Sequence, residues 1–250
     1  MPDVSYIFAR VERKYMITRA TARALLERLE GRLLPDEYGH STVANVYLDT
    51  RDFRLIRASI DADNYKEKLR IRAYGDPGPD DTVFLEIKKK FDGVVYKRRL
   101  SVPLRLAERY VDGGERPVSS QVMDEFDYAM RFWGRPGAAA VLCYERDAYY
   151  ARDDHDLRLT FDTDARCRFD RLHLSEGDDG IPLFDPDTVL LEIKFLNALP
   201  LWLTRALDEL GIRPTSYSKY GTAYRDLILG AHRRAAPSVQ KGEFTHAATV

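Results

Sequence analysis

The chain has 250 residues, of which 44% are hydrophobic, and this is enough to bury the core of one domain. Charged residues make up 32% of it while the formal net charge is -1, so the bulk positive field that attracts nucleic acids or membranes is absent. The two cysteines form no CxxC pair and no apolar run approaches a membrane span, which argues against a zinc site and predicts a cytoplasmic protein.

Apolar residues follow helical spacing after Thr18, from Ala22 to Leu33, and predict an amphipathic helix that ends before Pro35. Asp92 and Gly93 are a strong two-residue hairpin signal, so the segments on either side should pair as antiparallel strands. Strand-like alternation of apolar and polar residues is found at 42–49, 65–74, 82–91, 93–102, 139–149, 157–163 and 188–195.

Further helices are expected at 119–133, 198–210 and 216–229, each followed by a glycine that can end a helix. Glycine, proline and aspartate concentrate at 75–81, 112–117 and 175–187, which we interpret as loops. Residues 231–250 show little apolar periodicity and are predicted to be a disordered tail. This leaves residues 1–230 as one domain.

The segment 65–72 carries the first sign of function. Side chains two residues apart share one face of a strand, so Lys66, Lys68, Arg70 and Arg72 form a cationic row about 20 Å long. A strand facing water usually mixes charges to limit self-repulsion, whereas this row is purely positive. A plain solvated face is the alternative interpretation.

Ionisable residues recur on one face of the other strands, and a closed barrel would turn these rows inward. The predicted fold class is therefore α+β, a closed antiparallel β-barrel or tunnel of about eight strands with helices packed outside. Inward cations repel each other unless an anion joins them, and phosphate suits lysine and arginine. The rows include Glu86 with Lys88, Lys97 with Arg99, Tyr144 with Arg146, Arg158 with Asp162, and Glu192 with Lys194.

Carboxylates on these rows would partly neutralise the cations and offer oxygen ligands for a hard divalent metal, Mg²⁺ or Mn²⁺. Plainer interpretations stay open, because Glu192 could pair with Lys194 or with an inward arginine, and Glu86 with Lys88 or Lys97. Asp162 could instead cap the end of a strand. The candidate carboxylates are Glu12, Glu86, Asp162 and Glu192.

Taken in order, these motifs make the chain similar to the VTC-domain family of polyphosphate polymerases, within the triphosphate tunnel metalloenzyme (CYTH-like) superfamily. The resemblance covers about residues 8–229. No single motif is specific, but the ordered set is. Its carriers are residues 12–15, 45–50, 65–72, 83–90, 93–99, 144–146, 191–194 and 218–220.

The resemblance implies transfer of the γ-phosphate of ATP to inorganic polyphosphate or pyrophosphate, with release of ADP and dependence on Mn²⁺ or Mg²⁺. Glu192 is the implied metal ligand, and Glu86 is a second candidate. The expected phosphate-binding residues are Lys14, Lys68, Arg70, Arg72, Lys88, Lys97, Arg99, Tyr144, Arg146, Ser218 and Lys219. Those expected to act in catalysis are Arg70, Arg72, Lys88, Arg146 and Lys219.

Arg10 stands where hydrolases of the superfamily carry the first of two glutamates, which favours a polymerase. Two other functions stay open: hydrolysis of inorganic or nucleoside triphosphates in the same tunnel, and polyphosphate binding without turnover. Nucleic-acid binding is disfavoured because the basic rows lack interleaved aromatic residues. Eukaryotic relatives join the domain to a membrane-spanning part, so coupling to translocation would need a separate membrane partner.

Overall fold

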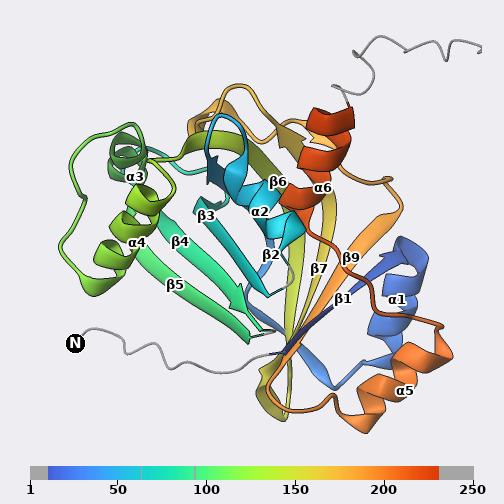
Figure 1. Ribbon diagram of the computed structural model, residues 1–250. Coiled ribbons are helices and arrows are strands. Elements are labelled where there is room, and N and C mark those ends of the chain that lie inside the picture. Colours follow the sequence, from blue (N-terminus) through green and yellow to red (C-terminus); the bar gives the residue numbers. More distant parts are fainter. Residues whose placement is uncertain (1–10, 63, 93, 231–250) are drawn as a thin grey trace, which may run out of the picture.

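The computed structural model describes residues 11–62, 64–92 and 94–230. The chain folds into a mixed α+β structure built on a nine-stranded antiparallel sheet (Figure 1). The strands are β1 (Val11–Thr18), β2 (Leu33–Asp49), β3 (Tyr65–Tyr74), β4 (Thr82–Phe91), β5 (Val94–Pro103), β6 (Gly137–Ala151), β7 (Asp154–Arg168), β8 (Ile181–Pro182) and β9 (Thr188–Phe195). The α-helices are α1 (Arg19–Arg28), α2 (Arg54–Asp61), α3 (Leu104–Val111), α4 (Gln121–Phe132), α5 (Leu201–Glu209) and α6 (Lys219–Ala223).

The sheet curls strongly along its length. Its order is β1-β9-β7-β6-β2-β3-β4-β5, with β8 paired to β7. Although β1 and β4 are far apart in this order, Lys88 Nζ of β4 lies 3.4 Å from Glu12 Oε2 of β1. We call the face that carries these two side chains the inner face.

The two end strands of the ladder are β1 and β5, and the described residues contain no hydrogen-bonded pairing between them. The hydrogen bonds of the described residues therefore do not close the sheet into the expected barrel. The free edge of β1 instead receives a backbone hydrogen bond from Thr215, whose N–H lies 2.7 Å from the carbonyl oxygen of Lys14. The segment before α6 covers that edge.

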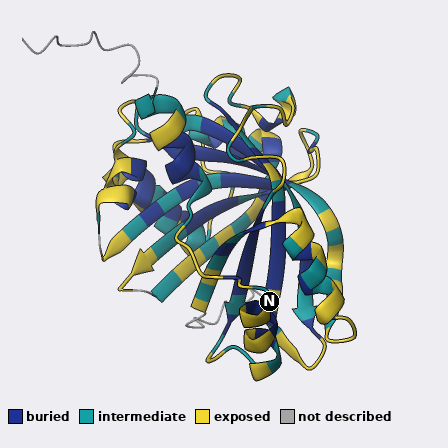
Figure 2. Cartoon of the chain, turned by 90° about the vertical axis from the view of Figure 1, so that its right-hand side faces the viewer, coloured by how far each residue is buried: buried dark blue, intermediate teal, exposed yellow. Residues whose placement is uncertain are grey.

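Helices cover the outer face in two groups. Leu69 and Ile71 of β3 pack in a core with α3 and α4, whereas Leu159 of β7 and Ile193 of β9 pack with α1 and α5. Figure 1 shows these two helix pairs on opposite sides of the molecule, and Figure 2 shows buried residues running along the strands beneath them. Alternation of apolar and polar residues thus fixes which side of each strand meets a helix.

Helix α6 departs from the expectation that helices lie outside. Its Tyr220 and Ala223 are buried with Val43, Tyr47 and other inner-face residues of β2 and β6. Helix α6 therefore packs on the inner face and covers part of it. No helix of the described residues is long and apolar enough to cross a membrane.

The first helix is shorter than predicted. It ends at Arg28, and Gly31 adopts a positive φ of 76° that turns the chain away. Strand β2 then begins at Leu33, so Pro35 lies inside a strand and not after a helix. The ladder shifts register between Pro35 and His40, which is where a residue without an N–H can be accommodated.

Two helices have no counterpart in the predictions, and in both the residue at the N-cap position has no capping side chain. Phe53 precedes α2 in the left-handed conformation, and Pro103 precedes α3; neither side chain caps its helix. Helix 216–229 starts later than expected, at Lys219, and continues as a π-helical turn from Tyr224 to Leu229.

The remaining predicted strands are found with longer or similar bounds, and β4 pairs with β5 from Phe91 and Val94 outward as the hairpin signal indicates. Strand β1 precedes the first element predicted from periodicity. Arg10, Gly93 and the predicted tail at 231–250 lie outside the described residues.

Candidate functional site

The cationic row of β3 lies on the inner face. Lys68, Arg70 and Arg72 are partly buried or buried there, while the alternate residues Leu69 and Ile71 are fully buried in the outer core. The period of two therefore places the charges as the sequence predicts. Two of the arginines are held by neutral groups: Arg70 Nη1 donates to Tyr47 OH at 3.1 Å, and Arg72 Nε donates to Asn45 Oδ1 at 2.9 Å.

Glu86 of β4 is the centre of a first cluster. Its carboxylate, 1% exposed, lies 2.6 Å from Arg70 Nη2 and 2.6 Å from Lys97 Nζ. The Nε atoms of Arg72 and Arg99 are each 3.8 Å away. Burial alone would raise the pKa of Glu86, but these cations, Arg70 first, hold it well below its usual value. The arrangement favours the ion-pair interpretation of Glu86 over a role as metal ligand.

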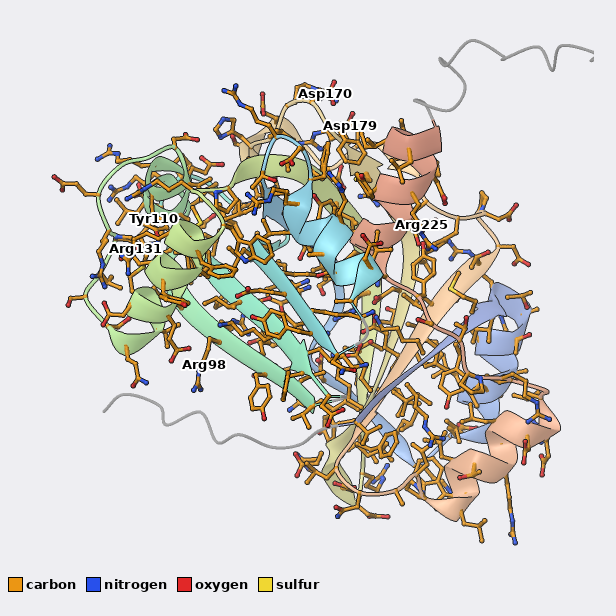
Figure 3. The ribbon with its side chains drawn as sticks, in the orientation of Figure 1. Arg98, Tyr110, Arg131, Asp170, Asp179 and Arg225 are labelled. Atoms are coloured by element: carbon orange, nitrogen blue, oxygen red, sulfur yellow. The ribbon has the colours of Figure 1, made fainter. Side chains whose placement is uncertain are left out.

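The cations of strand β5 alternate between the two faces of the sheet. Arg98, labelled in Figure 3, pairs across the outer face with Glu125 of α4, at 3.1 Å between Nε and Oε2. Its neighbours Lys97 and Arg99 consequently face the inner side, where each side chain stays 38% exposed. Exposure of both follows from the position of β5 at the end of the ladder.

A second cluster surrounds Asp162 of β7, which is fully buried. Arg146 of β6 donates to both of its oxygens, at 2.6 and 2.7 Å. Lys219 of α6 lies 2.5 Å from Asp162 Oδ2 and 3.6 Å from Glu192 Oε1. Burial would raise the pKa of Asp162, but Lys219 and Arg146 lower it. Asp162, one of the candidate carboxylates, thus anchors two of the expected phosphate binders, Arg146 and Lys219.

Glu192 and Glu12 extend the second cluster towards the first. Lys14 Nζ lies 3.4 Å from Glu192 Oε1 and 3.3 Å from Glu12 Oε1. Glu12 in turn reaches Lys88 at 3.4 Å. Burial would raise the pKa of Glu12, but Lys88 and then Lys14 outweigh it and lower this pKa to about 2. The carboxylates therefore stay ionised and hold the cations in a row.

The start of α6 supplies Ser218 and Lys219. Ser218 caps the helix by accepting the N–H of Gly221 at 3.1 Å, and its Oγ also accepts a hydrogen bond from Lys68 Nζ at 2.7 Å. The ammonium of Lys219 lies 4.3 Å from the centroid of the Tyr144 ring. The helix is fixed by Tyr220, whose hydroxyl donates to Asp49 Oδ2 at 2.9 Å.

In the part of the chain that the structure describes, Lys68 and Lys194 lie on the inner face without a carboxylate partner, unlike Lys14, Lys88, Lys97 and Lys219. Among the described residues neither has a carboxylate within ion-pair distance, and Lys68 has only the Ser218 hydroxyl. Burial, and then the charges of Lys14 and Lys88, lower the pKa of Lys68 to about 7. Burial also lowers the pKa of Lys194 to about 8, although Glu192 opposes this. The inner face therefore has positive charge that its own carboxylates do not balance.

The VTC domain family matches residues 9–228 of the chain. The chain belongs to the VTC-domain family. Among solved structures, a candidate adenylate cyclase from Bacillus halodurans is 17% identical, with 84% of this chain and 95% of that chain covered and a TM-score of 0.51. A candidate adenylate cyclase from Vibrio parahaemolyticus is 10% identical, with 87% and 98% covered and a TM-score of 0.45. No curated protein matches the chain.

At 17% identity, the Bacillus structure shows a shared fold for this VTC-domain protein and nothing finer. What the chain itself adds is the geometry of its inner face. The expected residues come together there in two clusters, and Tyr144 joins them because its hydroxyl accepts a hydrogen bond from Arg72 and its ring contacts Lys219. All of the expected phosphate binders lie on this face or at the start of α6.

The fit of a divalent metal can be tested on the donor set. Within the described ranges, no three His, Cys, Asp or Glu side chains are grouped as a metal cage. Magnesium, however, is commonly bound through one or two carboxylates together with substrate phosphates and water. Glu192 and Glu12 meet that requirement, since both are ionised, offer only oxygen and share Lys14 as a neighbour.

Three residues of the inner face were not among the predicted site residues. Tyr47 and Asn45 hold the guanidinium groups of Arg70 and Arg72 and were not among the candidates. Lys194 was noted only as a partner of Glu192. A signal existed for the first two, since Val43, Asn45 and Tyr47 alternate along β2 and pair with β3 across the ladder.

Proposed function

We propose that this VTC-domain protein is a metal-dependent polyphosphate polymerase that uses ATP. The observation that carries the proposal is the convergence of lysines and arginines from several strands and α6 on one partly balanced inner face. Membership of the VTC-domain family supports it. We further propose that residues 1–230 act as one domain and that the inner face closes into a tunnel when it surrounds a polyanion, with the Lys88–Glu12 contact as its first link.

In the proposed reaction, an oxygen of the terminal phosphate of the acceptor chain forms a bond to the γ-phosphorus of ATP. The bond from that phosphorus to the oxygen bridging to the β-phosphate breaks, and ADP leaves with its electron pair. Phosphoryl transfer of this kind needs alignment and charge stabilisation more than acid–base help.

The protein supplies both through cations that are already held in place. Arg72 is fixed by Asn45 and by Tyr144, whose hydroxyl lies 3.2 Å from Nη2. Arg146 is fixed by Asp162, and Lys219 by Asp162 and the start of α6. Donors that are ordered before the substrate arrives cost no reorganisation during the reaction. We assign catalysis to Arg70, Arg72, Lys88, Arg146 and Lys219.

Glu192, with Glu12 beside it, would hold Mg²⁺ or Mn²⁺. When bound, the metal supplies positive charge to the phosphate oxygens. Lys14 contacts both carboxylates, so it holds them at the same place on the inner face. Among the described residues, Lys68 lacks a carboxylate partner and donates only to the Ser218 hydroxyl. We assign it, with Lys14, Lys97, Arg99, Tyr144 and Ser218, to substrate binding.

The test is to incubate the purified protein with ATP, Mn²⁺ and a pyrophosphate primer and to resolve the products on a polyphosphate gel. Glu192→Gln keeps the shape of the side chain and removes its charge. Glu125→Gln removes an outer-face carboxylate that pairs with Arg98 and serves as the matched control. We expect a ladder from the wild type and the control and none from Glu192→Gln.

Three results would contradict the proposal or part of it. Release of free phosphate without a ladder, lost in Glu192→Gln, would assign a triphosphatase to the same face. Tight binding of polyphosphate with no turnover of ATP under any metal would leave a binding module. A ladder from Glu192→Gln equal to that of the wild type would remove Glu192 from the metal site.

A further inference from the structure

Three aromatic rings and one guanidinium form a ladder at the edge of the inner face. The rings of Tyr38 and Tyr74 are nearly parallel, with centroids 6.0 Å apart and planes 12° apart. Tyr74 meets Phe84 edge-on at 5.9 Å. The guanidinium of Arg99 lies 3.3 Å from the centroid of Phe84 and 5.7 Å from that of Tyr74. These groups come from β2, β3, β4 and β5, which are consecutive neighbours in the sheet. We call them the aromatic ladder.

The ladder is continuous with the phosphate-binding row. Tyr74 follows Arg72 by two residues on β3 and therefore shares its face. Phe84 is directly opposite Arg72 in the β3–β4 register and precedes Glu86 by two residues. Arg99 is opposite Glu86 in the β4–β5 register. A ligand that contacted the ladder would consequently place its adjoining groups beside Arg72.

Packing does not account for the two outermost rings. Tyr38 is 64% exposed and Tyr74 is 37% exposed. The side chain of Asp36 nevertheless holds Tyr38 in a defined turn, because Asp36 Oδ1 accepts the N–H of Tyr38 at 3.0 Å and that of Gly39 at 2.9 Å. Gly39 has a φ of 54°, the left-handed conformation that favours glycine. The irregular stretch in β2 after Pro35 thus presents an aromatic ring to solvent from a turn of defined backbone conformation.

We propose that Tyr38 and Tyr74 form a stacking platform for the base of a nucleoside triphosphate whose phosphates lie along Arg72 and Arg70. This inference rests on the proposed function. It means that the site binds a nucleoside triphosphate as phosphate donor in preference to inorganic triphosphate, because only the nucleotide has an aromatic base. Arg99 completes the platform, because a guanidinium plane also stacks on aromatic rings.

The platform carries a selectivity of its own. Every nucleobase has a π-face, so stacking alone discriminates little between bases. We therefore expect ATP and GTP to bind similarly and inorganic tripolyphosphate, which has no base, to bind without any contribution from the platform. The preference for a nucleotide lies at the aromatic ladder, and the affinity for phosphate lies at the cations.

The test measures binding by calorimetry, with a non-hydrolysable β,γ-imido analogue of ATP and with inorganic tripolyphosphate as separate ligands. The variants are Tyr38→Ala and Tyr74→Leu, the latter keeping apolar contact with Phe84. Stacking of one base contributes enough that we expect a loss of about 5- to 150-fold in affinity for the analogue. Affinity for tripolyphosphate should stay within about twofold of the wild type.

Two further variants show that the ring itself matters. Tyr74→Phe keeps the aromatic ring and should bind the analogue as the wild type does. Tyr128→Ala removes an exposed tyrosine, 60% accessible, that stacks on Phe132 of α4 on the outer side. It is the matched control for loss of an exposed aromatic residue, and both ligands should bind it normally.

An unchanged affinity for the analogue in both Tyr38→Ala and Tyr74→Leu would overturn the platform. So would an equal loss for the analogue and for tripolyphosphate, because the tyrosines would then act on phosphate binding and not on the base. If the wild-type protein bound neither ligand, the proposed phosphate site would itself be wrong, and the platform would fall with it.

Discussion

Replacing Glu86 by glutamine tests whether the inner face is held together by its own ion pairs. The substitution keeps the size of the side chain and leaves Arg70, Arg72, Lys97 and Arg99 without the carboxylate that they share. Removing one partner of a buried ion pair costs about 3–5 kcal/mol, and here Arg70 and Arg72 are the cations that would stay buried without their carboxylate. For a chain of this size, that corresponds to a fall of roughly 6–20 °C in Tm.

The assay is thermal unfolding of the wild type, Glu86→Gln and Glu125→Gln, each with and without inorganic tripolyphosphate. Glu125 pairs with Arg98 on the outer face and is partly exposed, so its loss should cost less than about 1 kcal/mol. Tripolyphosphate can take the place of the missing carboxylate. It should therefore raise the Tm of Glu86→Gln by more than it raises that of the wild type.

The dependence on pH follows from the lowered pKa of Glu86. A carboxylate whose pKa is lower in the folded than in the unfolded state contributes stability above its unfolded pKa, and the contribution is lost as the pH falls through the folded pKa. The difference in Tm between wild type and Glu86→Gln should therefore persist from pH 7 to about 5, above the unfolded pKa of about 4.3. A Tm for Glu86→Gln equal to that of Glu125→Gln would refute the reasoning.

Two further predictions concern β3. Lys68, whose pKa is lowered to about 7, should take up a proton when it binds phosphate, so affinity for tripolyphosphate should fall as the pH rises above about 7. Calorimetry in buffers of different ionisation enthalpy should detect this uptake, and Lys68→Gln should bind without that part of it; equal uptake by both proteins would contradict the assignment. Glu67 faces the outer side and accepts hydrogen bonds from Trp133 Nε1 at 2.9 Å and Tyr65 OH at 3.1 Å. Glu67→Gln should lower stability by about 1–3 kcal/mol in chemical denaturation with unchanged tripolyphosphate affinity, and a loss of affinity would show that β3 is sided differently.

The sequence was sufficient where the signal was local and periodic. Alternation along 65–74 predicted that Lys68, Arg70 and Arg72 share a face, and the same argument applied to β4 and β5. It was insufficient where an element is fixed from a distance. The residue before helix α2, Phe53, has no capping side chain; the first N–H of the helix donates to Thr50 Oγ1 and the next two donate to Asp49, both before the intervening turn.

The ion-pair partners of the candidate site could be predicted only where they depend on a local signal. That Glu86 would neutralise several cations requires the exact register of β3, β4 and β5, of which only the hairpin could be predicted. That Lys219 would meet Asp162 and Glu192 requires knowing that α6 packs on the inner face. Apolar periodicity indicates that one face of a helix is buried, but it does not indicate on which side of the sheet the helix packs.

The two clusters also differ in when they can form as the chain leaves the ribosome. Arg70 and Glu86 are 16 residues apart, and the strands that join them are consecutive, so the first cluster can balance its charges soon after synthesis. Lys14 and the carbonyl of Tyr217 are 203 residues apart, and closing such a loop costs entropy that only late contacts repay. During synthesis, Lys14 therefore lacks its partners Glu192 of β9 and the carbonyl of Tyr217 until nearly the whole domain has been made.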